Sequence, residues 1–264
     1  LEPLGVFLAS VVADRLAPAR ASAGGADAAA SAAAVWDVFR VAVAACFALS
    51  FASLRGQIVA LAGARGLYPC ADMLRAAARD LPRGERWLRI PVLWLWRSCA
   101  DGDLVRLCDV GVAAAAAAAL SPRGFWPCWA AWTAVGAAAP AAVGFTWDVL
   151  LAEVGFACAA LAPRRGAAPS RACVLAFRGI LCRVVLGMGK LKFARGWRTE
   201  GLYLKHFLAW QPLPTPLARF AARRAPDAAF RAGLYAMYAL EVAAPALFFS
   251  RSAFRRRAAA AATM

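Results

Sequence analysis

The sequence predicts an all-α integral membrane protein, a bundle of about six transmembrane helices with an interfacial amphipathic helix beside them. Of its 264 residues, 62% are hydrophobic and 17% are charged, whereas soluble domains average ~45–50% apolar and ~25% charged residues. The mean hydropathy is +0.58. The apolar residues form long runs rich in alanine and leucine, without the alternation of a β-strand, so helices are expected.

Six apolar runs approach the length of a membrane span, which takes about 20 helical residues across a core of ~30 Å. They cover residues 36–54, 104–120, 125–145, 147–161, 173–188 and 228–249. Several are short, so tilted or broken helices are expected. We assign 31–254 to the transmembrane domain, 1–30 to a polar, alanine-rich N-terminal segment and 255–264 to a truncated tail.

Two long polar connections separate these runs. In the first, residues 55–103, apolar and basic residues recur at helical spacing from Cys70 to Arg79, which predicts an amphipathic helix on the membrane surface. The following IPVLWLW is typical of an aromatic interface belt. The second, residues 189–226, is rich in proline and basic residues. Basic residues occur on both predicted sides, so the positive-inside rule gives no orientation.

The net charge of +16 comes mostly from single arginines between apolar stretches. A nucleic-acid-binding surface would instead gather its basic residues on one face, so we expect membrane lipids as partners and no nucleic acid. A nucleotide-binding loop ending at Lys190 would need a glycine at 184 and a hydroxyl at 191. The chain has Val184 and Leu191 there. The lysines of GMGKLK suit lipid phosphate instead, and its glycines allow close helix approach.

Catalytic and metal-binding patterns are missing from the sequence. The single histidine, His206, cannot supply a histidine cluster, and no G-x-S-x-G element occurs. We therefore expect no catalytic residues, no metal and no cofactor. Of the eight cysteines, five lie in apolar runs as small hydrophobes. The candidates for a disulfide or a redox role lie in or beside the first connection, and their spacing selects no pair: Cys70, Cys99 and Cys108.

Ionisable residues inside the fourth and fifth runs suggest two interhelical ion pairs, because charges at membrane depth normally find partners. An antiparallel hairpin turning near residue 165 would bring Asp148 level with Arg183 and Glu153 level with Arg178. In the simpler alternative, Asp148 caps its helix and Arg183 reaches the interface. A further acid, Glu241, precedes Pro245 by one turn and is expected to meet a basic residue or free backbone there.

An ordered set of motifs over residues 54–251 resembles the lipase maturation factor family. The most specific, FTWDVLLAEVGFACAALAP, is similar to the family element W-D-x-L-L-x-E-x-G-F. The others, in family order, are QIVALAGARGLYP, IPVLWLWRSCADGDL, FRGILCRVVLGMGKLKFARGW, WQPLPTPL and ALEVAAPALFFSR. The family-motif positions are Gln57, Gly63, Gly66, Pro69, Trp147, Gly155, Phe156, Gly187, Gly189, Lys190, Trp197, Gln211, Pro212, Pro214, Pro216, Glu241 and Pro245.

The resemblance implies a multi-pass protein of the endoplasmic-reticulum membrane that assists folding and assembly of secreted lipases, as a chaperone without catalytic residues. Client lipases would be contacted through parts missing from this chain. After Trp197 the family continues with an acidic residue and a Tyr-His-Tyr-Glu run, whereas this chain reads RTEGLYLKHFLAW, which implies a divergent branch. The alternative is a membrane enzyme or lipid-handling protein in which Asp148, Glu153 and Glu241 converge on an open cavity.

Overall fold

The computed structural model describes residues 25–82, 84–86, 90, 99–140, 142–210, 215–250 and 252–263. Within these ranges every regular element is a helix, which confirms the predicted all-α class. The chain divides into two compact units, Leu1–Val174 and Leu175–Met264.

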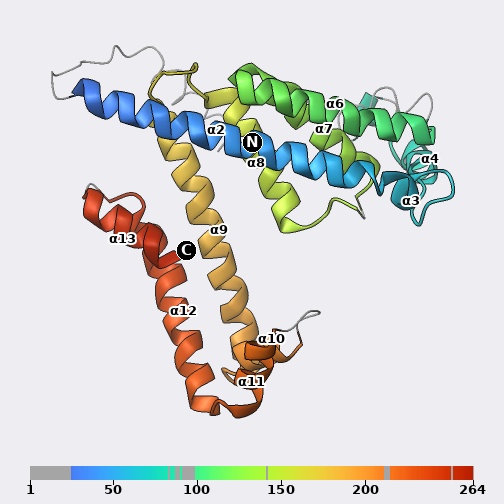
Figure 1. Cartoon of the computed structure of the whole chain (residues 1–264). Helices are drawn as coiled ribbons and strands as arrows, with labels where there is room; N and C mark the ends of the chain where they lie inside the picture. Colours follow the sequence, from blue (N-terminus) through green and yellow to red (C-terminus); the bar gives the residue numbers. More distant parts are fainter. Residues whose placement is uncertain are drawn as a thin grey trace. The chain divides into compact units, whose positions relative to one another are not determined.

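In the first unit the helices are α2 (Gly25–Arg55), α3 (Ile58–Ala62), α4 (Cys70–Asp80), α6 (Asp101–Leu120), the 3₁₀ turn η1 (Pro122–Gly124), α7 (Phe125–Ala138) and α8 (Thr146–Leu161). The long helix α2 packs lengthwise against α6, α6 packs on α7, and α7 on α8 (Figure 1). Because η1 turns the chain sharply, α6 and α7 form a helical hairpin.

Aromatic rings fill the centre of this unit. Phe51 of α2 meets Trp132 of α7 edge to face, with ring centroids 5.2 Å apart, and Phe47 lies 6.4 Å from Phe125. A glycine of α6 and one of α8 make room for these rings. A Cβ atom on Gly111 would lie 2.4 Å from the Phe51 ring, and one on Gly155 would lie 2.5 Å from the Phe47 ring. Small residues therefore let α6 and α8 approach α2.

The helix α9 (Arg171–Arg198) begins in the first unit and continues into the second. The other helices of the second unit are α10 (Tyr203–Ala209), α11 (Pro216–Arg224), α12 (Asp227–Leu247) and α13 (Ala253–Thr263). Thr215 caps α11, since its hydroxyl accepts the Ala218 N–H at 3.1 Å. The chain then returns along α12, which lies beside α9 (Figure 1).

Each of the six predicted apolar runs contains a helix, but the helix lengths differ from expectation. Among the described residues, two helices have both the length and the composition of a membrane span: Ala29–Arg55 and Arg171–Lys190, each containing an 18-residue stretch with a mean hydropathy of 1.8. Helices α7 and α8 have 14 and 16 residues, fewer than the about 20 of a perpendicular span. That all six runs cross the membrane therefore stays a prediction.

Two predicted boundaries are wrong. The third run was expected to extend to residue 145, but α7 ends at Ala138, just before Pro140, which lacks the N–H that a continuing helix uses. The second polar connection was expected to begin at residue 189, but α9 continues through GMGKLK to Arg198. The predicted amphipathic helix is present as α4. Most of the proposed aromatic belt, residues 91–96, lies outside the described residues.

Candidate functional site

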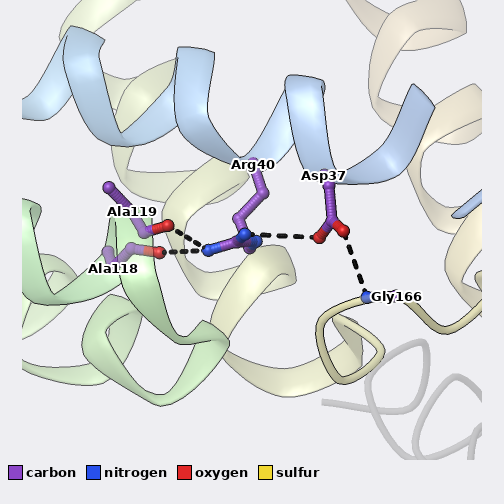
Figure 2. Close-up of polar contacts among 5 residues, drawn as sticks. All are labelled: Asp37, Arg40, Ala118, Ala119 and Gly166. Atoms are coloured by element: carbon purple, nitrogen blue, oxygen red, sulfur yellow. Dashed lines mark hydrogen bonds and ion pairs between the residues drawn. The ribbon is translucent and has the colours of Figure 1, made fainter. Parts of the chain in front are cut away.

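A buried arginine joins two helices of the first unit. Arg40 of α2 is 2% exposed. Among the described residues it is the one charged residue that is buried. Its Nη1 donates to the carbonyl oxygens of Ala118, at 3.1 Å, and of Ala119 (Figure 2). These carbonyls belong to the last turn of α6, whose oxygens have no partner within the helix and carry its negative dipole end. Arg40 therefore caps α6 from a neighbouring helix.

Asp37 extends this contact to the turn that follows α8. One of its carboxylate oxygens lies 3.3 Å from Nη2 of Arg40, and the other accepts the backbone N–H of Gly166 at 3.1 Å (Figure 2). Gly166 has a φ of 74°, a left-handed conformation that glycine adopts without steric cost. The cluster Asp37–Arg40 thus ties α2, the end of α6 and the turn together.

Sequence reasoning missed this cluster. Asp37 and Arg40 both lie in the first apolar run, three residues apart, where helical neighbours of opposite charge face the same side. That spacing was the available signal. It predicts the ion pair but not the capping of α6, because backbone carbonyls are present at every position and leave no mark on the sequence.

The predicted partners of Asp148 and Glu153 lie in the other unit, so the two interhelical pairs with Arg183 and Arg178 stay predictions. Asp148 does take the capping role that was the alternative. Its Oδ2 accepts the Phe145 N–H at 3.1 Å, at the start of α8. The indole N–H of Trp132 donates to the Asp148 carbonyl oxygen at 3.0 Å, which anchors the start of α8 against α7.

The acid Glu241 finds a basic partner within the second unit. Its Oε1 pairs directly with Nζ of Lys192, and the two side chains are 17% and 13% exposed. The Tyr238 hydroxyl donates to the Lys192 carbonyl oxygen at 2.9 Å. A Cβ on Gly189 would lie 3.0 Å from that of Glu241. The helices α9 and α12 therefore meet closely, and an ion pair fixes their register.

The other Glu241 oxygen, Oε2, is buried without a hydrogen-bond partner among the described residues. Of the two glycines predicted to permit close helix approach, Gly189 does so, whereas Gly187 has open space beside it in the described structure. Lys190 is exposed. The lysine that joins α9 to α12 is thus Lys192 and not the family-motif residue Lys190.

Other family-motif positions serve packing and turns. Gly63 and Gly66 lie in a turn where a Cβ would meet backbone atoms of α3 at 2.4 and 2.9 Å. Phe156 packs between Trp126 and Trp129, at centroid distances of 5.8 and 5.3 Å. The Gln57 side-chain amide donates to the Ser53 carbonyl, and the exposed Trp147 ring stacks on Phe145. The described prolines of the motif lie at helix ends or within a helix: Pro69 before α4, Pro216 at the start of α11 and Pro245 inside α12. Gln211, Pro212, Pro214 and the Trp197 side chain lie outside the described residues.

A basic hollow of about 680 Å³ opens where α6 and α8 end. Arginines surround it, Trp126 forms part of its wall, and no acidic side chain contributes to the described lining. The lining residues are Leu120, Ser121, Pro122, Arg123, Trp126, Ala159, Ala160, Ala162, Arg164 and Arg165. The described residues contain no group of three or more histidine, cysteine or acidic side chains that could hold a metal ion.

In the part of the chain that the structure describes, every regular element is a helix, and two of these helices are long and apolar enough to span a bilayer. Charged side chains also join neighbouring helices. These are the features of a helical membrane domain. The family model of the lipase maturation factor transmembrane domain matches residues 34–264. The chain therefore belongs to the lipase maturation factor family.

Its relatives include lipase maturation factor 2 of Mus musculus, 30% identical over 240 residues, and lipase maturation factor 2 of Homo sapiens, 31% identical over 248 residues. Each match covers 81% of this chain and 34% of the relative. The chain thus spans about a third of the length of these relatives. No solved structure matches it.

Proposed function

We propose that this chain is the membrane portion of a factor that assists folding and assembly of secreted lipases in the endoplasmic reticulum. The observation that carries the proposal is the family match over residues 34–264, together with the name shared by the relatives. In this proposal the protein is a multi-pass chaperone and not an enzyme. Client lipases bind parts of the full-length protein beyond the residues described.

The contacts between helices support a scaffold role for the membrane portion. Arg40 joins α2 to the end of α6, and Lys192 joins α9 to α12. Within each unit, polar side chains thus hold helices in register. A scaffold of this kind would hold the polar connection of each unit in a fixed conformation at the membrane surface, which would pre-organise a client-binding portion.

We also propose membrane lipids as partners, with the basic hollow as their head-group site. Guanidinium groups bind phosphate oxygens through paired, charge-assisted hydrogen bonds, and Arg123, Arg164 and Arg165 gather around one opening. Trp126 is suited to the interface between acyl chains and head groups. Basic pockets between transmembrane helices bind anionic lipid head groups in this way.

The maturation role can be tested by disrupting the gene in a cell that secretes a dimeric lipase. We expect the activity of the secreted lipase to fall while its synthesis continues, and re-expression of the full-length protein to restore it. A secreted protein that is not a lipase serves as the control and should be unaffected. Normal activity of the secreted lipase in the disrupted cells would exclude the proposed role.

A further inference from the structure

Two cysteines of the first polar connection meet in the structure. Cys70 is the first residue of α4, and Cys99 lies two residues before α6 begins. Their thiols are joined by a side-chain hydrogen bond. Cys70 is fully buried and Cys99 is half-buried. The structure therefore selects one pair from the three cysteines that the sequence left open.

Contacts that involve no sulfur hold these two segments together. The Asp101 carboxylate accepts the Ala64 N–H at 2.7 Å, which joins the start of α6 to the turn after α3. A Cβ on Gly63 would lie 2.7 Å from that same carboxylate oxygen, so the approach is close. The turn itself folds back on α3, where the Tyr68 N–H donates to the Leu61 carbonyl at 2.8 Å. These contacts hold the turn that leads to Cys70 against the start of α6, which Cys99 precedes.

We propose that Cys70 and Cys99 are an oxidisable dithiol whose disulfide closes residues 70–99 into a covalent loop and fastens α4 to the start of α6. The oxidant is a small disulfide of the glutathione class, R–S–S–R. The Cys99 thiolate attacks one sulfur of this oxidant and releases the first R–SH. The Cys70 thiolate then attacks the Cys99 sulfur and releases the second. Two protein thiols and one R–S–S–R thus give one protein disulfide and two R–SH.

The difference in exposure between Cys70 and Cys99 assigns these roles, and the hydrogen bond between the thiols supports the assignment. As its acceptor, Cys99 has a pKa below that of an ordinary thiol, because the Cys70 hydrogen bond stabilises its thiolate. The same bond, which Cys70 donates, raises the pKa of Cys70, and burial raises it further. Nucleophilic attack needs the thiolate, so Cys99 is the group that reacts first. Its partial exposure also leaves it accessible to a small oxidant.

Formation of the bond inside cells rests on the proposed location, because disulfides persist in the lumen of the endoplasmic reticulum and are reduced in the cytosol. The pairing itself does not depend on that location, nor on a role in lipase maturation. An oxidised pair in cells would place residues 55–103 on the lumenal side and so give the orientation that the charge distribution leaves open.

The first experiment uses the full-length protein in cells. Free thiols are blocked with N-ethylmaleimide before lysis, and the protein is digested without reduction and analysed by mass spectrometry. We expect a peptide pair linked through Cys70 and Cys99, with neither cysteine labelled by the reagent. In the Cys70→Ser variant Cys99 should become labelled, and in Cys99→Ser the label should appear on Cys70. The matched control Cys46→Ser, at an exposed position, should keep the link.

The second experiment uses the purified full-length protein in lipid nanodiscs, equilibrated with mixtures of reduced and oxidised glutathione. We expect Cys70 and Cys99 to lose reactivity together, in one two-electron transition. Independent labelling of the two thiols in oxidised glutathione, or a link from either to Cys108, would overturn the proposal. A link that forms in nanodiscs but is missing from cells would keep the dithiol and reject the lumenal location. Neither outcome depends on the lipase assay.

Discussion

Lys192 of α9 and Glu241 of α12 form a largely enclosed ion pair, and the Tyr238 hydroxyl bonds the Lys192 carbonyl beside it. The two residues are 49 positions apart in the chain. Their pairing fixes how α12 lies along α9. A contact of this kind specifies register more than it adds net stability, because removing two charges from water offsets much of their attraction.

The first prediction concerns this pair. Lys192→Met alone should lower the free energy of unfolding by about 3 kcal/mol, because it leaves the Glu241 carboxylate enclosed without a counter-charge. The double variant Lys192→Met with Glu241→Leu should recover most of that loss. Thermal unfolding in detergent measures both. Lys190→Met, at an exposed neighbouring position, is the control and should change little. Additive losses in the double variant would contradict the pairing.

The second prediction concerns Arg40. Arg40→Met should cost about 3 kcal/mol, because it uncaps the last carbonyls of α6 and leaves Asp37 without its partner. Arg40→Lys should recover only part of this loss, since an ammonium lacks the planar fork of a guanidinium. Hydrogen exchange should show faster opening at the end of α6 in both variants. Equal protection of that end in wild type and Arg40→Met would rule out the capping role.

The third prediction concerns the approach of α8 to α2. Gly155→Ala places a methyl group 2.5 Å from the Phe47 ring, and overpacking of this kind costs about 1–3 kcal/mol. Gly179→Ala, where the described structure leaves open space, is the matched control and should be neutral or slightly stabilising. Phe47→Leu should partly rescue Gly155→Ala. The melting temperatures of Gly155→Ala, Gly179→Ala and the double variant Phe47→Leu with Gly155→Ala test this, and a neutral Gly155→Ala would argue against the contact.

The fourth prediction concerns pH. Lys205 lies 2.7 Å from Asp227, and its hydrogen bond holds the pKa of the Asp227 carboxyl below its usual value. The stabilisation is present above the ordinary aspartate pKa of about 3.9 and is lost as the pH falls through the lower folded-state pKa. The stability difference between wild type and Asp227→Asn should therefore be constant near neutrality and shrink in acid. A difference that grows on acidification would contradict the assignment.

The fifth prediction concerns the basic hollow. Replacing Arg123, Arg164 and Arg165 together by alanine should reduce retention of phosphatidylinositol about tenfold relative to phosphatidylcholine, because the charge-assisted bonds to phosphate are lost. Native mass spectrometry of the purified protein measures the retained lipid. The triple alanine variant of Arg219, Arg223 and Arg224, on α11, controls for total charge. Equal losses in the two variants would show a general charge effect and no specific site.

The helices could be predicted from the sequence because the apolar runs are rich in alanine and leucine and lack strand alternation. The two misplaced boundaries have local causes. Pro140 interrupts a run whose composition alone reads as continuous. Conversely, GMGKLKFAR looks like a polar boundary, but after its glycines it contains good helix formers and no proline, so α9 continues.

The contacts within the site were harder to predict. The pairing of Glu241 with Lys192, and not with Lys190, depends on the rotation of two helices about their axes, which hydropathy does not encode. Likewise, the spacing of Cys70, Cys99 and Cys108 favours no pair, and the choice follows from the turn that brings Ala64 to Asp101. The capping role of Asp148 was accessible because acids at helix starts have a local geometric reason.

The length of α9 has a consequence for how the second unit meets the membrane. Its 28 residues extend ~42 Å at ~1.5 Å per residue, whereas a hydrocarbon core is ~30 Å thick. If Arg171–Lys190 fill that core, Lys192 stands at its edge, in the layer where water content changes most steeply. A thicker bilayer would draw the Lys192–Glu241 pair toward hydrocarbon, and a thinner one would hydrate it. With α9 placed in this way, membrane thickness would set the strength of the link between α9 and α12.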